Sequence, residues 1–189
     1  NVRILILGGF TRGFVRYALL TFIPLFAVRI LGASLVEAGS LLSLRGIGYV
    51  SVSPLAGLVV ARTSRKLALG SSLLISAVTL ILIPFSDGLV VLGGLVLAYS
   101  VGDALLDPVM KDSITAVADP DYRAGIVNSL YVFKRVAQTL SPAVFGIVLS
   151  LWGFRTLYVL AGLFTLGYLG LFSIRFAEPP VTLTDGTVD

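Results

Sequence analysis

The sequence predicts an all-α, polytopic membrane protein with six transmembrane helices. Of its 189 residues, 57% are hydrophobic and only 13% are charged, and the mean hydropathy is +1.00. Soluble domains carry about 25% charged residues, so this composition is typical of a chain that crosses a bilayer several times. One crossing needs about 20 mostly apolar residues, and six such windows fit along the chain.

The six windows follow one another with short polar breaks between them. They are predicted over residues 4–28, 35–60, 67–85, 89–109, 124–149 and 154–176. Turn signals separate them, such as Ser-Asp-Gly over 86–88 and Asp-Pro-Asp over 119–121. We therefore expect one six-helix unit over residues 1–180 and a polar cytoplasmic tail over 181–189. Gly162, Gly167 and Gly170 have spacings that favour tight helix packing.

Basic residues are divided unequally between the two ends of these windows. With the N-terminus inside, the inner segments hold seven: Arg3, Arg62, Arg65, Lys66, Lys111, Arg123 and Arg175. The outer segments hold Arg29 and Arg155. Positive loops face the cytoplasm, so both termini are expected there. The expected location is the plasma (inner) membrane, with the lipid bilayer as the first partner.

Two residue types are missing, which narrows the possible chemistry. The sequence has no cysteine and no histidine, which excludes disulfides and removes the commonest zinc ligands. We expect no metal site and no other cofactor. Without a nucleophile–base pair or a carboxylate cluster, an enzyme is not expected. The net charge of +4 is spread over loops and spans, which does not indicate nucleic-acid binding.

Four of the six windows contain charged residues in their apolar centres. These are Arg12 and Arg16, Arg45, Asp103 and Asp107, and Lys134 and Arg135. A charge at mid-bilayer costs a few kcal/mol or more and persists only beside a cavity or a partner. The first, second, fourth and fifth spans are therefore predicted to line a polar interior. The third and sixth are predicted to brace them.

The fifth window carries a polar stripe. Asn128, Tyr131, Arg135 and Gln138 are spaced by three, four and three residues, so they share one helical face. The other faces are apolar. This pattern predicts a helix with one side toward a polar interior.

The buried charges allow two interpretations. In the first, a cationic cavity binds an anionic or zwitterionic substrate, and Asp103 or Asp107 is the protonatable group that couples transport to protons. In the second, ion pairs such as Arg16–Asp103 and Lys134–Asp107 only hold helices together. Five cations against two acids favour the cavity. For Arg45, cavity lining and helix packing stay equally open.

A weak internal repeat relates the two halves of the chain. The pairs Arg12/Arg16 and Asp103/Asp107 both have i,i+4 spacing and are offset by 91 residues. Arg45 and Lys134 are offset by 89, and the prolines at positions 54 and 142 by 88. Three spans per unit would invert the second unit, giving a 3+3 inverted-topology repeat.

The segment over 57–66, Gly-Leu-Val-Val-Ala-Arg-Thr-Ser-Arg-Lys, resembles the loop motif Gly-x-x-x-Asp-Arg-x-Gly-Arg-Arg/Lys of the major facilitator superfamily. Four positions match: Gly57, Arg62, Arg65 and Lys66. Ala61 and Ser64 replace the motif's Asp and second Gly, and the loss of the Asp affects the motif's gating salt bridge.

Two shorter segments carry the same resemblance. Residues 141–146, Ser-Pro-Ala-Val-Phe-Gly, are similar to the family's Gly-Pro-x-x-Gly-Gly in the fifth span. Residues 122–125, Tyr-Arg-Ala-Gly, are similar to the Arg-Gly with which that span begins. The resemblance extends to about Pro180.

The resemblance implies one six-helix half-barrel of a transporter, and the weak loop motif suggests the carboxy-terminal half. A second six-helix half would be its partner, and a small solute or drug-like compound would cross by alternating access. The 57–66 loop would gate the movement. A non-transporting scaffold or receptor, and a six-span homodimeric carrier or channel, stay open as alternatives. The start at Asn1, with Met110 as the only methionine, favours a piece of a longer chain.

Overall fold

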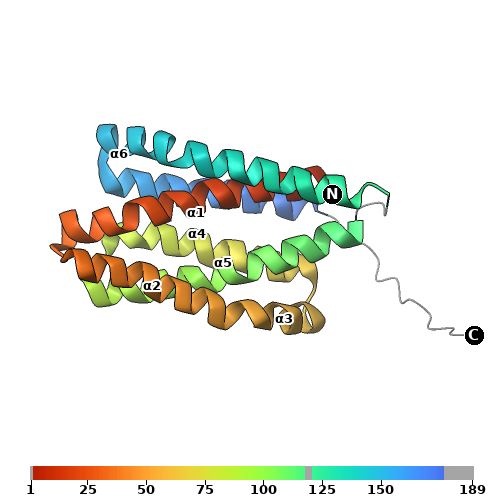
Figure 1. Ribbon diagram of the computed structural model, residues 1–189, viewed down its shortest axis with the longest axis horizontal. Helices are drawn as coiled ribbons and strands as arrows, with labels where there is room; N and C mark the ends of the chain where they lie inside the picture. Colours follow the sequence, from red (N-terminus) through yellow and green to blue (C-terminus); the bar gives the residue numbers. More distant parts are fainter. Residues whose placement is uncertain (1, 118–120, 177–189) are drawn as a thin grey trace, which may run out of the picture.

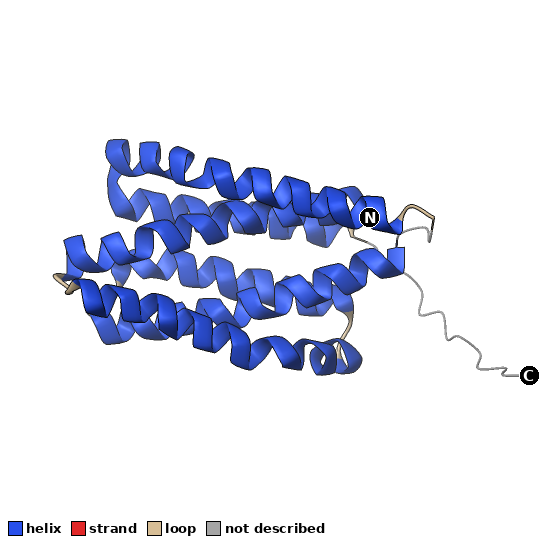
Figure 2. Ribbon diagram, viewed as in Figure 1, coloured by secondary structure: helices blue, strands red, loops and turns tan. Residues whose placement is uncertain are grey.

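The computed structural model describes residues 2–117 and 121–176, and this part of the chain is helical without strands (Figures 1 and 2). The elements are α1 (Val2–Leu31), α2 (Leu35–Val52), η1 (Ser53–Leu55), α3 (Ala56–Arg62), α4 (Arg65–Leu82), η2 (Ile83–Phe85), α5 (Leu89–Val117) and α6 (Arg123–Arg175). Five helical stretches in it are long and apolar enough to cross a membrane. The predicted all-α membrane architecture is confirmed at this level.

The last helix, α6, is too long for a single crossing. Its 53 residues would extend for about 80 Å, against a hydrocarbon core of about 30 Å. Gly153 interrupts it with φ 77° and ψ 178°, a conformation that glycine adopts without steric cost. Figure 1 shows α6 doubling back on itself. We call residues 123–152 the first arm and residues 154–175 the second arm.

Contacts with α1 give the directions of the two arms. In the first arm, Ser141 Oγ donates to the Phe14 carbonyl at 2.5 Å, and Gly146 lies farther along α1, near Phe22. The first arm therefore runs parallel to α1. In the second arm, Tyr158 packs on Phe26 and Tyr168 donates to the Ile4 carbonyl, so this arm runs antiparallel.

Local sequence signals set the element ends. Ser34 and Glu37 form a reciprocal capping box at the start of α2. Pro54 and Pro84 each lie in a short 3₁₀ turn, because proline cannot donate the next helical hydrogen bond. Pro108 lies inside α5 without ending it. This helix continues to Val117, whereas the sequence predicted its end at 109. The prediction ended early because the last two turns carry polar residues, which a hydropathy window excludes.

Two apolar cores lie toward opposite ends of the bundle. One contains residues such as Leu5, Leu69 and Phe172, near the N-terminal end of α1. The other contains residues such as Phe26 and Tyr158, near the opposite end. The buried charges Arg12 and Asp103 lie between the two cores along α1 and α5. The predicted tail over 181–189 and part of the 119–121 turn lie outside the described residues.

Helix α4 and the second arm of α6 pack closely at one of the three glycines predicted to allow tight packing. A Cβ added to Gly162 of the second arm would lie 2.5 Å from Ile81 Cγ1 and 2.9 Å from the Ala77 carbonyl of α4. Gly167 and Gly170 have nothing within 4 Å of such an atom. The packing prediction is therefore right for Gly162 and wrong for the other two, because only Gly162 faces α4.

Candidate functional site

Six charged side chains from four helical segments meet between the two cores. They are Arg12 and Arg16 of α1, Arg45 of α2, Asp103 and Asp107 of α5, and Lys134 of the first arm. We call this group the ion-pair cluster. Within the described part of the chain, α4 and the second arm contribute no charge to it. The charged residues thus come from the four spans that the sequence indicates.

Asp103 is the centre of the ion-pair cluster and is fully buried. Arg12 Nε donates to its Oδ1 at 2.9 Å, and Arg12 Nη2 donates to its backbone carbonyl at 3.0 Å. Arg45 Nη2 donates to the other carboxylate oxygen, Oδ2. Both carboxylate oxygens are therefore used, as a buried carboxylate requires.

Asp107, one turn along α5, is more exposed. Lys134 Nζ donates to its two carboxylate oxygens at 2.9 and 3.2 Å, and Arg12 Nη1 also contacts Oδ1. Tyr49 of α2 donates its hydroxyl to Oδ2 at 3.3 Å. The side chain is 26% exposed, against 1% for Asp103.

Arg16 lies beside the two acids without a hydrogen bond to either. Its Nε is 3.6 Å from Asp103 Oδ2 and its Nη1 is 4.0 Å from Asp107 Oδ2. The buried Nε finds no hydrogen-bond partner among the described residues. The guanidinium instead lies over the Tyr49 ring, 5.3 Å from its centroid, a cation–π contact. Donor capacity is therefore left on Arg16.

A polar cavity of about 190 Å³ opens beside Arg16. Its lining consists of Arg16, Tyr17, Tyr131, Lys134, Arg135 and Gln138. Arg135 Nη1 donates to Gln138 Oε1 at 3.2 Å, and Lys134 Nζ lies 5.9 Å from the centroid of the Tyr131 ring. No described carboxylate pairs with Arg135. Among the described residues, the ion-pair cluster and the lining of this cavity together contain five cations and two acids.

Most of the predicted polar stripe lines this cavity. Tyr131, Arg135 and Gln138 do so, whereas Asn128 is exposed and lies outside the lining. Asn128 precedes Tyr131 by almost one turn, so it shares the face at another depth.

Three aromatic or basic side chains at the site were not predicted. Tyr49 bridges Asp107, Arg16 and Arg45, and its i,i+4 spacing from Arg45 is the signal that could have found it. Tyr17 lines the cavity, and Lys111 lies over the Tyr131 ring. No comparable spacing signal marks these two.

The predicted gating loop joins α3 to α4. Gly57 is inside α3, and Arg62 is its exposed last residue. Arg65 begins α4, whose cap is the Ser64 hydroxyl, and its Nε donates to Asp112 Oδ2 of α5 at 2.5 Å. Lys66 is half-buried. Asp112 thus gives this loop a carboxylate although Ala61 replaces the acid of the motif.

No group of three or more potential metal ligands comes together in residues 2–117 and 121–176. Among curated proteins, nothing matches the chain. The sequence profile of the Major Facilitator Superfamily matches it over residues 5–187. This match covers nearly all of the sequence and agrees with the helical bundle and with the loop and span motifs. It shows that the chain belongs to the Major Facilitator Superfamily.

Proposed function

We propose that the chain is one six-span half of a secondary transporter, the carboxy-terminal half, with both ends in the cytoplasm of a plasma-membrane protein. The break at Gly153 and the opposed directions of the two arms support counting α6 as two crossings. Arg3, Arg62 and Arg175 support the orientation, because they lie at helix ends that would share one side of the membrane.

The four contacts between α1 and α5 in the ion-pair cluster support an inverted 3+3 repeat. The proposed repeat relates Arg12 to Asp103 and Arg16 to Asp107. Under this relation, the Arg12–Asp107 pair corresponds to the Asp103–Arg16 pair. Both pairs are present, together with Arg12–Asp103 and Arg16–Asp107. A set of contacts that is unchanged by this relation is expected beside a two-fold axis in the membrane plane.

The proposed substrate is a small anionic or zwitterionic solute that binds in the polar cavity. The observation that carries this proposal is the unpartnered Nε of Arg16 beside Arg135, which has no described carboxylate partner, in a region with excess positive charge. A planar guanidinium binds two oxygens of a carboxylate or phosphate at once. Asp103 and Asp107 already have cationic partners, so they act as internal counter-ions. If transport is coupled to protons, the more exposed Asp107 is the better candidate.

A second six-helix half is the proposed partner. Arg135 is exposed on the first arm, beside Val132 at 60% and Val136 at 46% exposure. If this face met acyl chains, the guanidinium would lie in hydrocarbon at a cost of several kcal/mol. Another half of the transporter would cover the apolar residues and keep Arg135 beside the polar cavity. Rocking of the two halves would then expose the cavity to each side in turn.

The test uses the complete protein in liposomes and a panel of acetate, succinate, glutamate and phosphate. Wild-type protein should exchange at least one of these solutes, and Arg16→Ala should abolish exchange while leaving the protein folded and inserted. Arg29→Ala is the matched control, because Arg29 is exposed at the other end of α1.

Three results would count against the proposal. Undiminished exchange by Arg16→Ala would remove Arg16 from the binding site. Failure of the wild type to exchange any solute would favour a non-transporting scaffold. Exchange by the chain alone, without a second half, would favour a homodimeric carrier or channel.

A further inference from the structure

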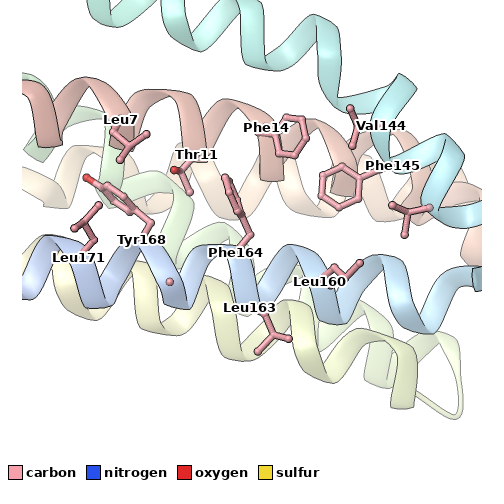
Figure 3. Close-up of a pocket in the computed structure, with 12 residues that line it drawn as sticks. Leu7, Thr11, Phe14, Val144, Phe145, Leu160, Leu163, Phe164, Tyr168 and Leu171 are labelled. Atoms are coloured by element: carbon pink, nitrogen blue, oxygen red, sulfur yellow. The ribbon is translucent and has the colours of Figure 1, made fainter.

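A second hollow, unrelated to the polar cavity, lies between α1 and the two arms of α6. It has a volume of about 610 Å³, and its lining is almost entirely apolar. Figure 3 shows Leu7 and Phe14 of α1, Phe145 of the first arm, and Phe164 of the second arm around this space. We call it the apolar groove. It shares no residue with the polar cavity.

The apolar groove is long enough to hold most of one acyl chain and reaches past the middle of the span. Its lining on the second arm extends from Leu160 to Leu171, which corresponds to about 16 Å along a helix. The hydrocarbon core of a bilayer is about 30 Å thick, so the groove covers about half of it. Its polar groups are few, and the Tyr168 hydroxyl already donates to the Ile4 carbonyl at 3.0 Å.

At one end the apolar groove continues into a cationic hollow. This hollow of about 450 Å³ shares Leu7 and Leu171 with the groove, and its lining also includes Arg3 and Arg175. Both arginines are exposed. In residues 2–117 and 121–176, neither has a carboxylate within ion-pair distance. Two cations therefore lie where an apolar channel reaches the helix ends.

We propose that the apolar groove and these two arginines form a binding site for an anionic phospholipid of the leaflet nearest the N-terminus. The phosphate lies between Arg3 and Arg175, and one acyl chain lies along the groove from Leu171 toward Leu160. Arginine suits phosphate because its donors match the oxygens. A zwitterionic headgroup would bring its own cation close to the two arginines, so an anionic lipid binds more tightly.

The test measures binding of phosphatidylglycerol to the purified full chain in neutral detergent by native mass spectrometry. Phosphatidylcholine with the same acyl chains is the comparison lipid. We expect phosphatidylglycerol to bind about thirtyfold more tightly, since each of the two arginines contributes on the order of one kcal/mol beside an anionic lipid. Replacing both arginines, R3Q with R175Q, should remove this preference. R29Q with R155Q removes two exposed cations at the other helix ends and should leave the preference unchanged.

Two glycines of the second arm provide a matched test of the apolar groove. Gly167 lines the groove and Gly170 does not, yet neither has an atom within 4 Å of an added Cβ. Gly167→Leu should weaken binding of both lipids, and Gly170→Leu should leave it unchanged. Thermal unfolding without added lipid checks that each variant is folded.

The proposal is overturned if Gly167→Leu binds lipid as Gly170→Leu does, or if R3Q with R175Q keeps the preference for phosphatidylglycerol. A protein that co-purifies on the groove and is not displaced by lipid would also overturn it. These results leave the transport proposal untouched, because the groove and the polar cavity are separate.

Discussion

Arg12 and Arg16 are one turn apart on α1, yet they have different surroundings. The side chain of Arg12 is 2% exposed and donates to the carboxylate and the carbonyl of Asp103. The side chain of Arg16 is 20% exposed, reaches no acid within hydrogen-bond distance, and faces the polar cavity. A shift of four residues therefore separates an arginine with two hydrogen bonds to Asp103 from one whose Nε has no described hydrogen-bond partner. Under the proposed function, the structural interpretation of the buried charges would hold for Arg12 and the binding interpretation for Arg16, on two sides of one charged layer.

The largest effect is expected at the centre of the ion-pair cluster. Asp103→Asn keeps the size of the side chain but leaves Arg12 and Arg45 buried without their common counter-ion. Removing one partner of a buried ion pair costs about 3–5 kcal/mol. We expect a large loss of monodisperse protein in size-exclusion chromatography and a lower unfolding temperature. Asp87→Asn, in an exposed turn, is the control. An unchanged unfolding temperature for Asp103→Asn would contradict the structural role.

The two arginines themselves should differ in stability. Arg12→Gln removes charged hydrogen bonds to Asp103, each worth about 1.5–3 kcal/mol, although Arg45 remains as a partner. Arg16→Gln removes no hydrogen bond to an acid, so it should cost about 1 kcal/mol or less. Thermal unfolding of the two variants in the same detergent measures the difference. Equal destabilisation would show that Arg16 is as structural as Arg12.

Substitution of Arg135 tests the polar cavity without changing a member of the ion-pair cluster. Arg135→Lys keeps the charge but loses the planar pair of donors, so solute exchange in liposomes should fall severalfold while stability stays the same. Lys134→Arg is not an equivalent control, because Lys134 also holds Asp107. Arg29→Lys, at the exposed end of α1, keeps a cation far from the cavity and should exchange at the wild-type rate. Wild-type exchange by Arg135→Lys would mean that charge alone is required.

The sequence predicted the helical segments and the origin of the buried charges well, because both depend on hydropathy along a single helix. It also placed the break between 149 and 154, where Gly153 turns the chain. The two ion pairs named from the sequence, Arg16–Asp103 and Lys134–Asp107, are both present, at 3.6 and 2.9 Å. The other partners could not be predicted in the same way. Asp103 takes Arg12 and Arg45 from two other helices, and which cation reaches which oxygen depends on helix rotation and depth. For the same reason the sequence could not separate Gly162, which faces α4, from Gly167, which faces open space.

Substitutions of Tyr49 should have the smallest effects on stability and exchange. They test the difference between Arg12 and Arg16 most closely, because Tyr49 contacts both sides of the charged layer. Its hydroxyl donates to Asp107 at 3.3 Å, on the structural side, while its ring lies 5.3 Å from Arg16, on the cavity side. Tyr49→Phe removes only the hydroxyl, so it should lower stability by about 1 kcal/mol and leave exchange nearly unchanged. Tyr49→Leu also removes the cation–π contact and should reduce exchange because Arg16 is less well positioned. If both variants lose exchange equally, the hydroxyl rather than the ring orients the site, and the two sides of the charged layer act as one.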